Sequence, residues 1–396
     1  MGPDVQRIFA SRQGNRAAAL SRLARLGRTL LRLQAGPSRW PPPAVPGQRR
    51  VLLHVGLHKT GTTALQRFLS GAAADFQTHG VLYPKSGRST DSADAHHNIA
   101  WQMGGDRRFR SSRGALNDVA AEISSFPGDA IISSEDFESI LGTPARFMPM
   151  LKHPLLKGHA FTIVFWVRDQ ASYLESLFFE MLRHRMAQEA VRFGESALAC
   201  GQIRHDDWTF HFDYASVYAG LLGLPATIVA RPYAGLIGSS IVSDFLAFSG
   251  LDCASDGAGS QERANSRLSL PEALSLFCER RLGSAPADRS TRCEAFVRLL
   301  DGRPVRLSSP LRAALIARFA ACNRRLARAC GFPTGALAIS PLPPAGAIPM
   351  EAIFSLSTQC ALADFAGHHA DMSELPFSRS SADGGSEGRL LHTAWR

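Results

Sequence analysis

The residues from Gly56 to Thr63 have the types and spacing of an anion-binding loop. The segment GLHKTGTT follows an apolar run that ends at Val55, and it leads into an amphipathic run with Leu65 and Phe68 on one face. Glycine permits tight turns, the N–H groups of a following helix start point outward, and a lysine supplies a compact cation. The segment therefore predicts a strand, a loop that binds phosphate or sulfate through Lys59, and a helix.

The register of this loop differs from that of the common nucleoside-triphosphate loop. There, four residues separate the first glycine from a Gly-Lys-Ser/Thr triplet, whereas Lys59 comes three residues after Gly56 and precedes Gly61. A glycine-rich turn that binds nothing is the alternative interpretation. The lysine, the hydroxyls of residues 60–63 and the preceding strand favour anion binding.

A second candidate for anion binding is Arg168, which ends the apolar run FTIVFWV. Ser176 lies eight residues later in a helix-like run, whose turns are expected to bring its hydroxyl near the guanidinium. The planar guanidinium suits bidentate recognition of phosphate. The alternative is an ion pair between Arg168 and Asp169 or Glu175.

The elements that must position these residues alternate between strand-like and helix-like patterns. Such spacing predicts an α/β fold, with a mostly parallel sheet flanked by helices. Ligands of these sheets bind at the carboxyl ends of the strands, where the loop 56–63, Ser134–Glu135 and Arg168–Asp169 all fall. The predicted strands are Arg50–Val55, Ala130–Ser134, Phe161–Val167 and Ala226–Ala230.

The string HVGLHKTGTTALQRFL closely resembles the 5′-phosphosulfate loop of sulfotransferases that use 3′-phosphoadenosine 5′-phosphosulfate (PAPS), especially the bacterial members. Other segments resemble landmarks of the same family in the same order, over roughly residues 50 to 332. They are VLYP at 81–84, His96 and His97, IISSEDFE at 131–138, FTIVFWVRDQASYLESLF at 161–178 and RPYAGLIGSSIVSDFLAFSGL at 231–251. The resemblance implies a nucleotide fold of the P-loop type with a helical C-terminal part.

The resemblance also implies an activity, which is transfer of a sulfuryl group from PAPS to a hydroxyl or amine of an organic acceptor, without a metal. A carbohydrate and a lipid are both open as acceptors. Lys59 is then expected to stabilise the leaving 5′-phosphate, and Arg168 and Ser176 to hold the 3′-phosphate. The loop residues expected to contact the donor are His58, Lys59, Thr60, Gly61, Thr62 and Thr63.

The proton of the acceptor requires a base, for which two candidates stay open. Glu135 follows a predicted strand and lies where the carboxylate bases of carbohydrate-type sulfotransferases are found, so it is the first candidate. The alternative for this region is a helix start capped by Ser133 or Ser134. Cytosolic members of the family use a histidine, which suits the task because imidazole titrates near neutral pH. Of the adjacent pair, His97 is preferred to His96 because it lies closer to the predicted helix start.

The net charge of +10 is concentrated at the N-terminus. Residues 1–50 contain ten arginines, no lysine and one acid, which gives +9 and leaves +1 for the remainder. This distribution does not favour a surface that tracks nucleic acid, so no nucleic-acid partner is predicted. Leucines recur at helical spacing among the arginines, which predicts either peripheral contact with an anionic membrane or acidic partner, or a disordered leader.

The chain divides by composition into a basic leader over residues 1–48, an α/β domain over 49–332 and a partly disordered Pro/Gly/Ser-rich extension over 333–396. Helices are expected at Leu270–Leu282 and within 306–332. The seven cysteines include no C-x-x-C pair, and no run of 18 apolar residues occurs. We therefore expect a cytoplasmic protein without a disulfide framework, zinc site or membrane-spanning helix, with the leader as its one route to a membrane surface.

Two rival functions remain from the sequence alone. The first is a nucleotide-dependent kinase, against which stand the register of the loop and the lack of a clear acidic strand end for Mg²⁺. The second is a non-catalytic scaffold that retains a nucleotide fold.

Overall fold

The computed structural model describes residues 39–89, 93–233, 240–251, 268–282, 289–358 and 362. Most of the basic leader, residues 1–38, and most of the C-terminal extension, residues 363–396, lie outside the described residues. The predictions for these two segments therefore stay predictions.

The chain forms two compact units. The first comprises Met1–Val167, Asp213–Ser260 and Ala321–Leu337, and the second comprises Arg168–Phe212, Gln261–Ala320 and Ala338–Arg396. The candidate loop, Glu135 and His97 belong to the first unit, whereas Arg168 and Ser176 belong to the second.

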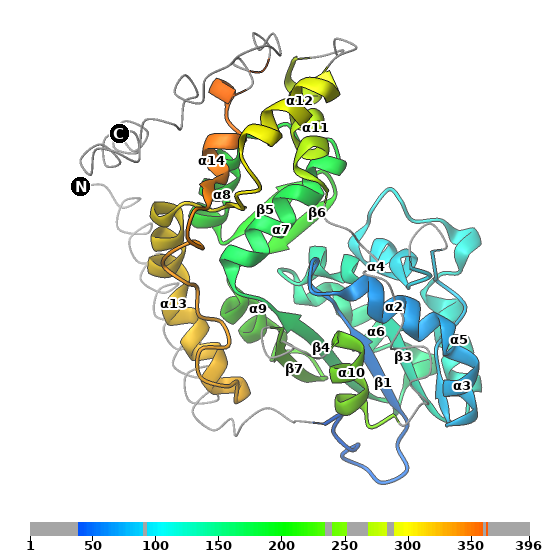
Figure 1. Cartoon of the computed structure of the whole chain (residues 1–396). Helices are drawn as coiled ribbons and strands as arrows, with labels where there is room; N and C mark the ends of the chain where they lie inside the picture. Colours follow the sequence, from blue (N-terminus) through cyan, green and yellow to red (C-terminus); the bar gives the residue numbers. More distant parts are fainter. Residues whose placement is uncertain are drawn as a thin grey trace, which may run out of the picture. The chain divides into compact units, whose positions relative to one another are not determined.

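The first unit is built on a five-stranded sheet with the order β2-β3-β1-β4-β7, in which each neighbouring pair is parallel. Figure 1 shows β1, β3, β4 and β7 side by side. The predicted α/β fold with a mostly parallel sheet flanked by helices is thus confirmed. The strands are β1 (Arg50–His54), β2 (Val81–Leu82), β3 (Asp129–Ser133), β4 (Ala160–Val167) and β7 (Thr227–Pro232).

The four predicted strands correspond to β1, β3, β4 and β7, with ends that differ by one or two residues. Strand β2 was not predicted as a strand, because two residues are too few to produce a period. It pairs with β3 through Val81 and Leu82 at the edge of the sheet.

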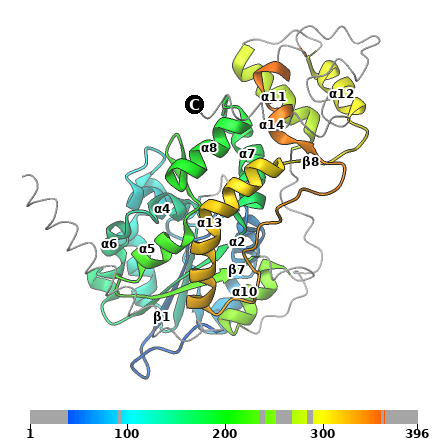
Figure 2. The same ribbon diagram turned by 90° about the vertical axis from the view of Figure 1, so that its left-hand side faces the viewer.

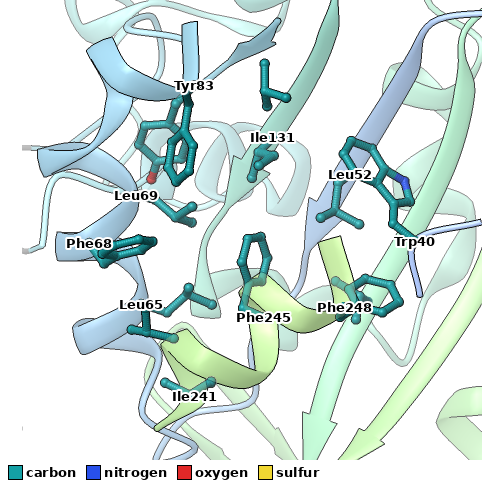
Figure 3. Close-up of a cluster of buried hydrophobic side chains, with 14 of the residues drawn as sticks. Trp40, Leu52, Leu65, Phe68, Leu69, Tyr83, Ile131, Ile241, Phe245 and Phe248 are labelled. Atoms are coloured by element: carbon teal, nitrogen blue, oxygen red, sulfur yellow. The ribbon is translucent and has the colours of Figure 1, made fainter. Parts of the chain in front are cut away.

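One face of the sheet is covered by α2 (Thr62–Gly71), α3 (Ala73–Thr78) and α10 (Ile241–Ser249). Figure 3 shows Leu65 and Phe68 of α2 and Phe245 of α10 turned towards Leu52 and Ile131 of the strands. The apolar residues of these helices recur every three or four positions and therefore lie on one face, which packs against the sheet.

The opposite face is covered as well, because successive residues of β1 from Val51 to His54 are all fully buried. Right-handed crossovers place the helices between β2 and β4 on the side opposite to α2. Figure 2 shows α5 (Leu116–Ser125) and α6 (Met148–Leu151) on that side. Two covered faces explain why these strands are continuous apolar runs.

The order of the strands creates a switch point between β1 and β3. The chain leaves β1 towards the edge strand β2, and it leaves β3 towards β4 on the other side of β1. Connections that diverge in this way open a crevice at the carboxyl ends of the two strands. The remaining elements of this unit are α4 (His97–Gly104), η1 (Ser111–Arg113), η2 (Glu135–Ile140), η3 (Pro144–Phe147), η4 (Pro154–Leu156) and α9 (Tyr214–Leu221).

The second unit is mainly helical. The predicted helix over Leu270–Leu282 is confirmed as α11, and the one within 306–332 as α13 (Ser309–Cys330), which begins in the second unit and ends in the first. Gly331 follows α13 with a φ of 66°, as expected for a helix stop. The other elements are α7 (Gln170–Arg183), α8 (Ala190–Cys200), α12 (Arg289–Leu299), α14 (Met350–Ile353), the antiparallel pair β5 (Gln202–His205) and β6 (Trp208–His211), and the parallel pair β8 (Val305–Arg306) and β9 (Ile348–Pro349).

Candidate functional site

Two residues of the loop between β1 and α2 have a left-handed backbone conformation. Lys59 has a φ of 62° and Gly61 a φ of 82°. The hydroxyl of Thr60, which is fully buried, donates to the carbonyl oxygen of Leu57 at 2.7 Å and closes the turn between them. The Thr60 side chain is therefore committed to the loop itself.

The first turn of α2 keeps the electrostatic character of a helix start. Its N-cap is Gly61, which has no side chain to accept a hydrogen bond, and no acidic residue lies in the first turn. The positive end of the helix dipole is thus not neutralised from within α2. Thr62 is buried, and Thr63 is half-buried at this end of the helix.

The loop also depends on the absence of a side chain at Gly56. A Cβ there would lie 2.3 Å from Cγ2 of Thr62 and 3.2 Å from the ring of His54. His54 is fully buried, and burial lowers its pKa to about 3, so its imidazole is neutral. The start of α2 is thereby packed directly against the end of β1.

We expect Gly56→Ala to destabilise the protein by about 1–3 kcal/mol, because the added methyl overpacks a site lined by buried side chains. Urea denaturation measures this loss. The control is Gly71→Ala, where an added Cβ meets nothing within 4 Å. Equal stability of Gly56→Ala and the unsubstituted protein would contradict the close packing.

Lys59 is half-buried and lies between two anchored residues, His58 and Thr60. The N–H of His58 donates to Oε2 of Glu138 at 2.8 Å, and Nδ1 of its ring lies 2.8 Å from the same oxygen. Its Nε2 lies 3.5 Å from Oδ1 of Asp136. Both ring nitrogens of His58 therefore face carboxylates of η2.

Glu135 begins η2, directly after Ser134 at the end of β3. Its Oε2 accepts a hydrogen bond from Nε2 of Gln66, a fully buried residue one turn into α2. Glu135 is half-buried, and this hydrogen bond ties its carboxylate to α2, the helix that follows the loop 56–63. Ser134 caps η2 by accepting from the N–H of Asp136 at 3.1 Å, which confirms the capping alternative for this segment.

His97 lies at the first position of α4, next to the same segment. Its Nδ1 is 2.8 Å from Oγ of Ser134 and 3.6 Å from Oδ2 of Asp136. Its ring stacks on Trp101 with the centroids 5.9 Å apart. Among the residues that the structure describes, the buried Nε2 atom has no hydrogen-bond partner.

His96 has a structural place instead. It is fully buried, its Nε2 lies 3.0 Å from the carbonyl oxygen of Pro84, and its Nδ1 accepts from the N–H of Ser133. Burial lowers its pKa to about 3. Both ring nitrogens of His96 are thus engaged by backbone groups.

The predicted proximity of Arg168 and Ser176 is confirmed within the second unit. Nη1 of Arg168 donates to Oγ of Ser176 at 3.2 Å, and both side chains are half-buried. Asp169 caps α7 by accepting from the N–H of Ser172, and Glu175 binds Arg312 at 2.7 Å. The two acids considered as alternative partners thus have other contacts.

Asp136, Glu138 and Gln66 also lie at this site, and none of the three was predicted as a site residue from the sequence. Asp136 also accepts from Nε1 of Trp101 and lies 3.7 Å from Nη1 of Arg108. The signal was a run of acids directly after a strand at the switch point. Their basic partners could not be identified, because Glu138 and His58 are 80 residues apart.

The described part of the chain contains no group of three or more His, Cys, Asp or Glu side chains arranged to hold a metal ion. Within the same part, no helix is both long enough and apolar enough to cross a membrane.

The structure thus brings Lys59, Glu135 and His97 to one end of the first unit, by way of β1, β3 and the start of α4. Comparisons with protein-family models, with curated proteins and with solved structures found no significant match for this chain.

Proposed function

We propose that the protein is a sulfotransferase that moves the sulfuryl group of PAPS to a hydroxyl or amine of an organic acceptor. The observation that carries this proposal is the loop from Gly56 to Thr63. It combines Lys59 in a left-handed turn with an uncapped helix start, at the switch point of a parallel sheet. This combination suits an anion with several oxygens.

The 5′ end of the donor is assigned to this loop. The ammonium of Lys59 and the start of α2 favour the negative charge that accumulates on the leaving 5′-phosphate as the S–O bond breaks. Because Thr60 donates to Leu57, we assign the contribution of Thr60 to its backbone, which the closed turn keeps in shape.

The 3′-phosphate is assigned to Arg168 and Ser176, which already meet through a hydrogen bond of 3.2 Å. A planar guanidinium suits bidentate recognition of a phosphate, and a hydroxyl can rotate towards an anion.

The acceptor proton is assigned first to Glu135. In the reaction the acceptor oxygen forms a bond to sulfur, the bond from sulfur to the 5′-phosphate oxygen breaks, and the proton passes to the carboxylate. Gln66 donates to this carboxylate and so fixes its orientation. Glu135 is also half-buried, so an acceptor can reach it.

His97 is the alternative base. The carboxylate of Asp136, 3.6 Å from Nδ1, favours a proton on that nitrogen and leaves Nε2 as the proton acceptor. The Nε2 atom of His97, which lacks a hydrogen-bond partner among the described residues, supports this alternative. Because this atom is buried when no acceptor is bound, we place His97 second to Glu135.

A pair of variants separates the two bases. We expect Glu135→Gln to lower turnover by about two to four orders of magnitude, since a positioned base contributes that much, and His97→Asn to lower it less than tenfold. The measurement is single-turnover transfer over a range of pH. The reverse order of the two losses would assign the proton to the imidazole.

The function itself is tested by calorimetry with adenosine 3′,5′-bisphosphate, followed by transfer of radiolabelled sulfate from PAPS to pools of carbohydrate, lipid and small-molecule acceptors. We expect binding and transfer to at least one pool. Magnesium-dependent transfer from ATP would favour a kinase, and the absence of nucleotide binding would favour a scaffold.

A further inference from the structure

The anion loop is held from outside by two carboxylates of η2. Oε2 of Glu138 accepts from both the backbone N–H and Nδ1 of His58, and Oδ1 of Asp136 lies 3.5 Å from Nε2. The Glu138 side chain is fully buried, and those of Asp136 and His58 are 8% and 13% exposed. His58, Asp136 and Glu138 thus form an ion cluster that is shielded from solvent, and His58 directly precedes Lys59 in the chain.

The geometry of Lys59 gives this cluster a mechanical role. A non-glycine residue in the left-handed region costs about 1–2 kcal/mol and persists only where its surroundings hold it. Lys59 has a φ of 62°, and both of its neighbours are tied down, His58 by Glu138 and Thr60 by Leu57. Loss of the contact between His58 and Glu138 is therefore expected to loosen this conformation.

The charge states of His58 and Asp136 also support a role for this cluster. Burial by itself would lower the pKa of His58, but the hydrogen bonds and negative charges of Asp136 and Glu138 raise it to about 10. Burial would likewise raise the pKa of Asp136, and His58, His97 and Arg108 hold it well below its usual range. The cluster therefore contains an imidazolium and an ionised Asp136 at neutral pH.

We propose that His58 is the positioning residue of the anion loop: an imidazolium that joins the loop to η2, keeps Lys59 in its left-handed turn and neutralises the carboxylates beside the anion site. Its ligand-binding consequence depends on the proposed function, whereas its charge and its hold on the loop do not. His58 acts through Lys59 and needs no contact with the donor.

The electrostatic part follows from what lies next to the loop. Without the imidazolium, the ionised carboxylate of Asp136 and the fully buried Glu138 would lie directly behind a turn that must accept an anion, and a charge that now balances them would be lost. Buried like charges oppose the binding of an anion. Neutralisation by His58 removes this penalty.

The first test is calorimetric titration with adenosine 3′,5′-bisphosphate. We expect His58→Gln to weaken binding about 10- to 100-fold, as for loss of a supporting contact behind a ligand-binding group. The matched control is His153→Gln. Nε2 of His153 contacts Asn117 away from the loop, so this variant should bind the nucleotide as tightly as the unsubstituted protein does.

A double-mutant cycle separates positioning from general destabilisation. If His58 acts through Lys59, His58→Gln should weaken binding strongly in the unsubstituted protein and little in a Lys59→Ala background. Additive losses of the two substitutions would overturn the positioning role. Glu138→Gln combined with His58→Gln should recover part of the binding, because it replaces one of the two carboxyl groups behind the loop with a neutral amide.

The second test needs no ligand. Nitrogen-15 spectra of the histidine rings should show His58 protonated at pH 8, and amide exchange at residues 58–61 should be at least about tenfold faster in His58→Gln than in the unsubstituted protein. A neutral His58 at pH 8, or unchanged exchange of these amides, would overturn the proposal. Lack of nucleotide binding by the unsubstituted protein, with both results as expected, would instead overturn the proposed function.

Stability against pH gives a third readout. The folded state holds the His58 proton up to a pH of about 10, whereas the unfolded chain releases it near 6.5. The stabilisation is thus complete below pH 6.5 and is lost as the pH rises through about 10. The melting temperature should fall between pH 7 and 8.5. This range lies below the pH at which the buried thiol of Cys330, whose pKa is raised to about 11, adds its own pH dependence of stability. His58→Gln should flatten this slope, and an unchanged slope would count against the charged His58.

Discussion

Lys59→Ala should lower turnover of sulfuryl transfer by about two to four orders of magnitude, the effect of losing one preorganised charged contact in the transition state. The reaction is chiefly a matter of placing charge, since the leaving 5′-phosphate must accept the electrons of the broken S–O bond. Among the residues assigned to the donor's 5′ end, Lys59 is the cationic side chain whose placement the turn determines. Single-turnover transfer from PAPS measures the loss.

Two further variants separate the amine of Lys59 from its backbone. Lys59→Gly favours the observed φ of 62° yet removes the amine, so it should lose as much turnover as Lys59→Ala. Lys152→Ala removes an exposed lysine and should leave turnover unchanged. Full activity of Lys59→Ala would end the assignment of this lysine to the leaving group.

Glu175→Ala should destabilise the second unit by about 3–5 kcal/mol, because it leaves a buried guanidinium without its counter-charge. Oε1 of Glu175 accepts from Nη2 of Arg312 at 2.7 Å and from the N–H of Leu307 at 3.0 Å. Both charged side chains are only 9% exposed. The loss should appear in urea denaturation and as faster amide exchange in α7 and α13.

The matched control is the exposed pair of Arg192 and Glu195, with side chains 66% and 26% exposed. Glu195→Ala should change stability by less than about 1 kcal/mol. Replacement of both buried partners, Glu175→Leu with Arg312→Met, should recover most of the loss, since the buried guanidinium is removed together with its counter-charge. Arg306, whose Nε lies 3.8 Å from Oε2 of Glu175, is 31% exposed and keeps its contact with solvent. If Glu175→Ala lowers the free energy of unfolding by less than about 1 kcal/mol, the pair of Glu175 and Arg312 does not stabilise the fold as we expect.

Local features of the chain were predictable from the sequence. The strand, loop and helix around Lys59 depend on neighbouring residues. The same holds for the meeting of Arg168, two residues before α7, with Ser176 in the second turn of that helix. Four of the five strands of the sheet were recognised because both faces are covered, so their apolar runs are unbroken. Strand β2 escaped prediction because it is two residues long.

The roles within the acidic segment after β3 could not be predicted in the same way. The sequence shows that Glu135, Asp136 and Glu138 follow a strand, but it does not show which of them meets which partner. The parallel register of β1 and β3 sets His54 against Ser133, and it thereby brings the two following loops together. Only then does His58 meet Glu138, and Gln66 meet Glu135.

The sequence by itself determined the α/β class, the strand, loop and helix around Lys59 and the approximate positions of four strands, because these follow from local turns, helix starts and the burial pattern of single elements. Tertiary structure alone decided the order of the strands and the partners of His58, Glu135 and His97. Each of these contacts joins residues 37 to 80 positions apart. Such pairings depend on which strands lie side by side, and no periodicity within one element encodes that choice.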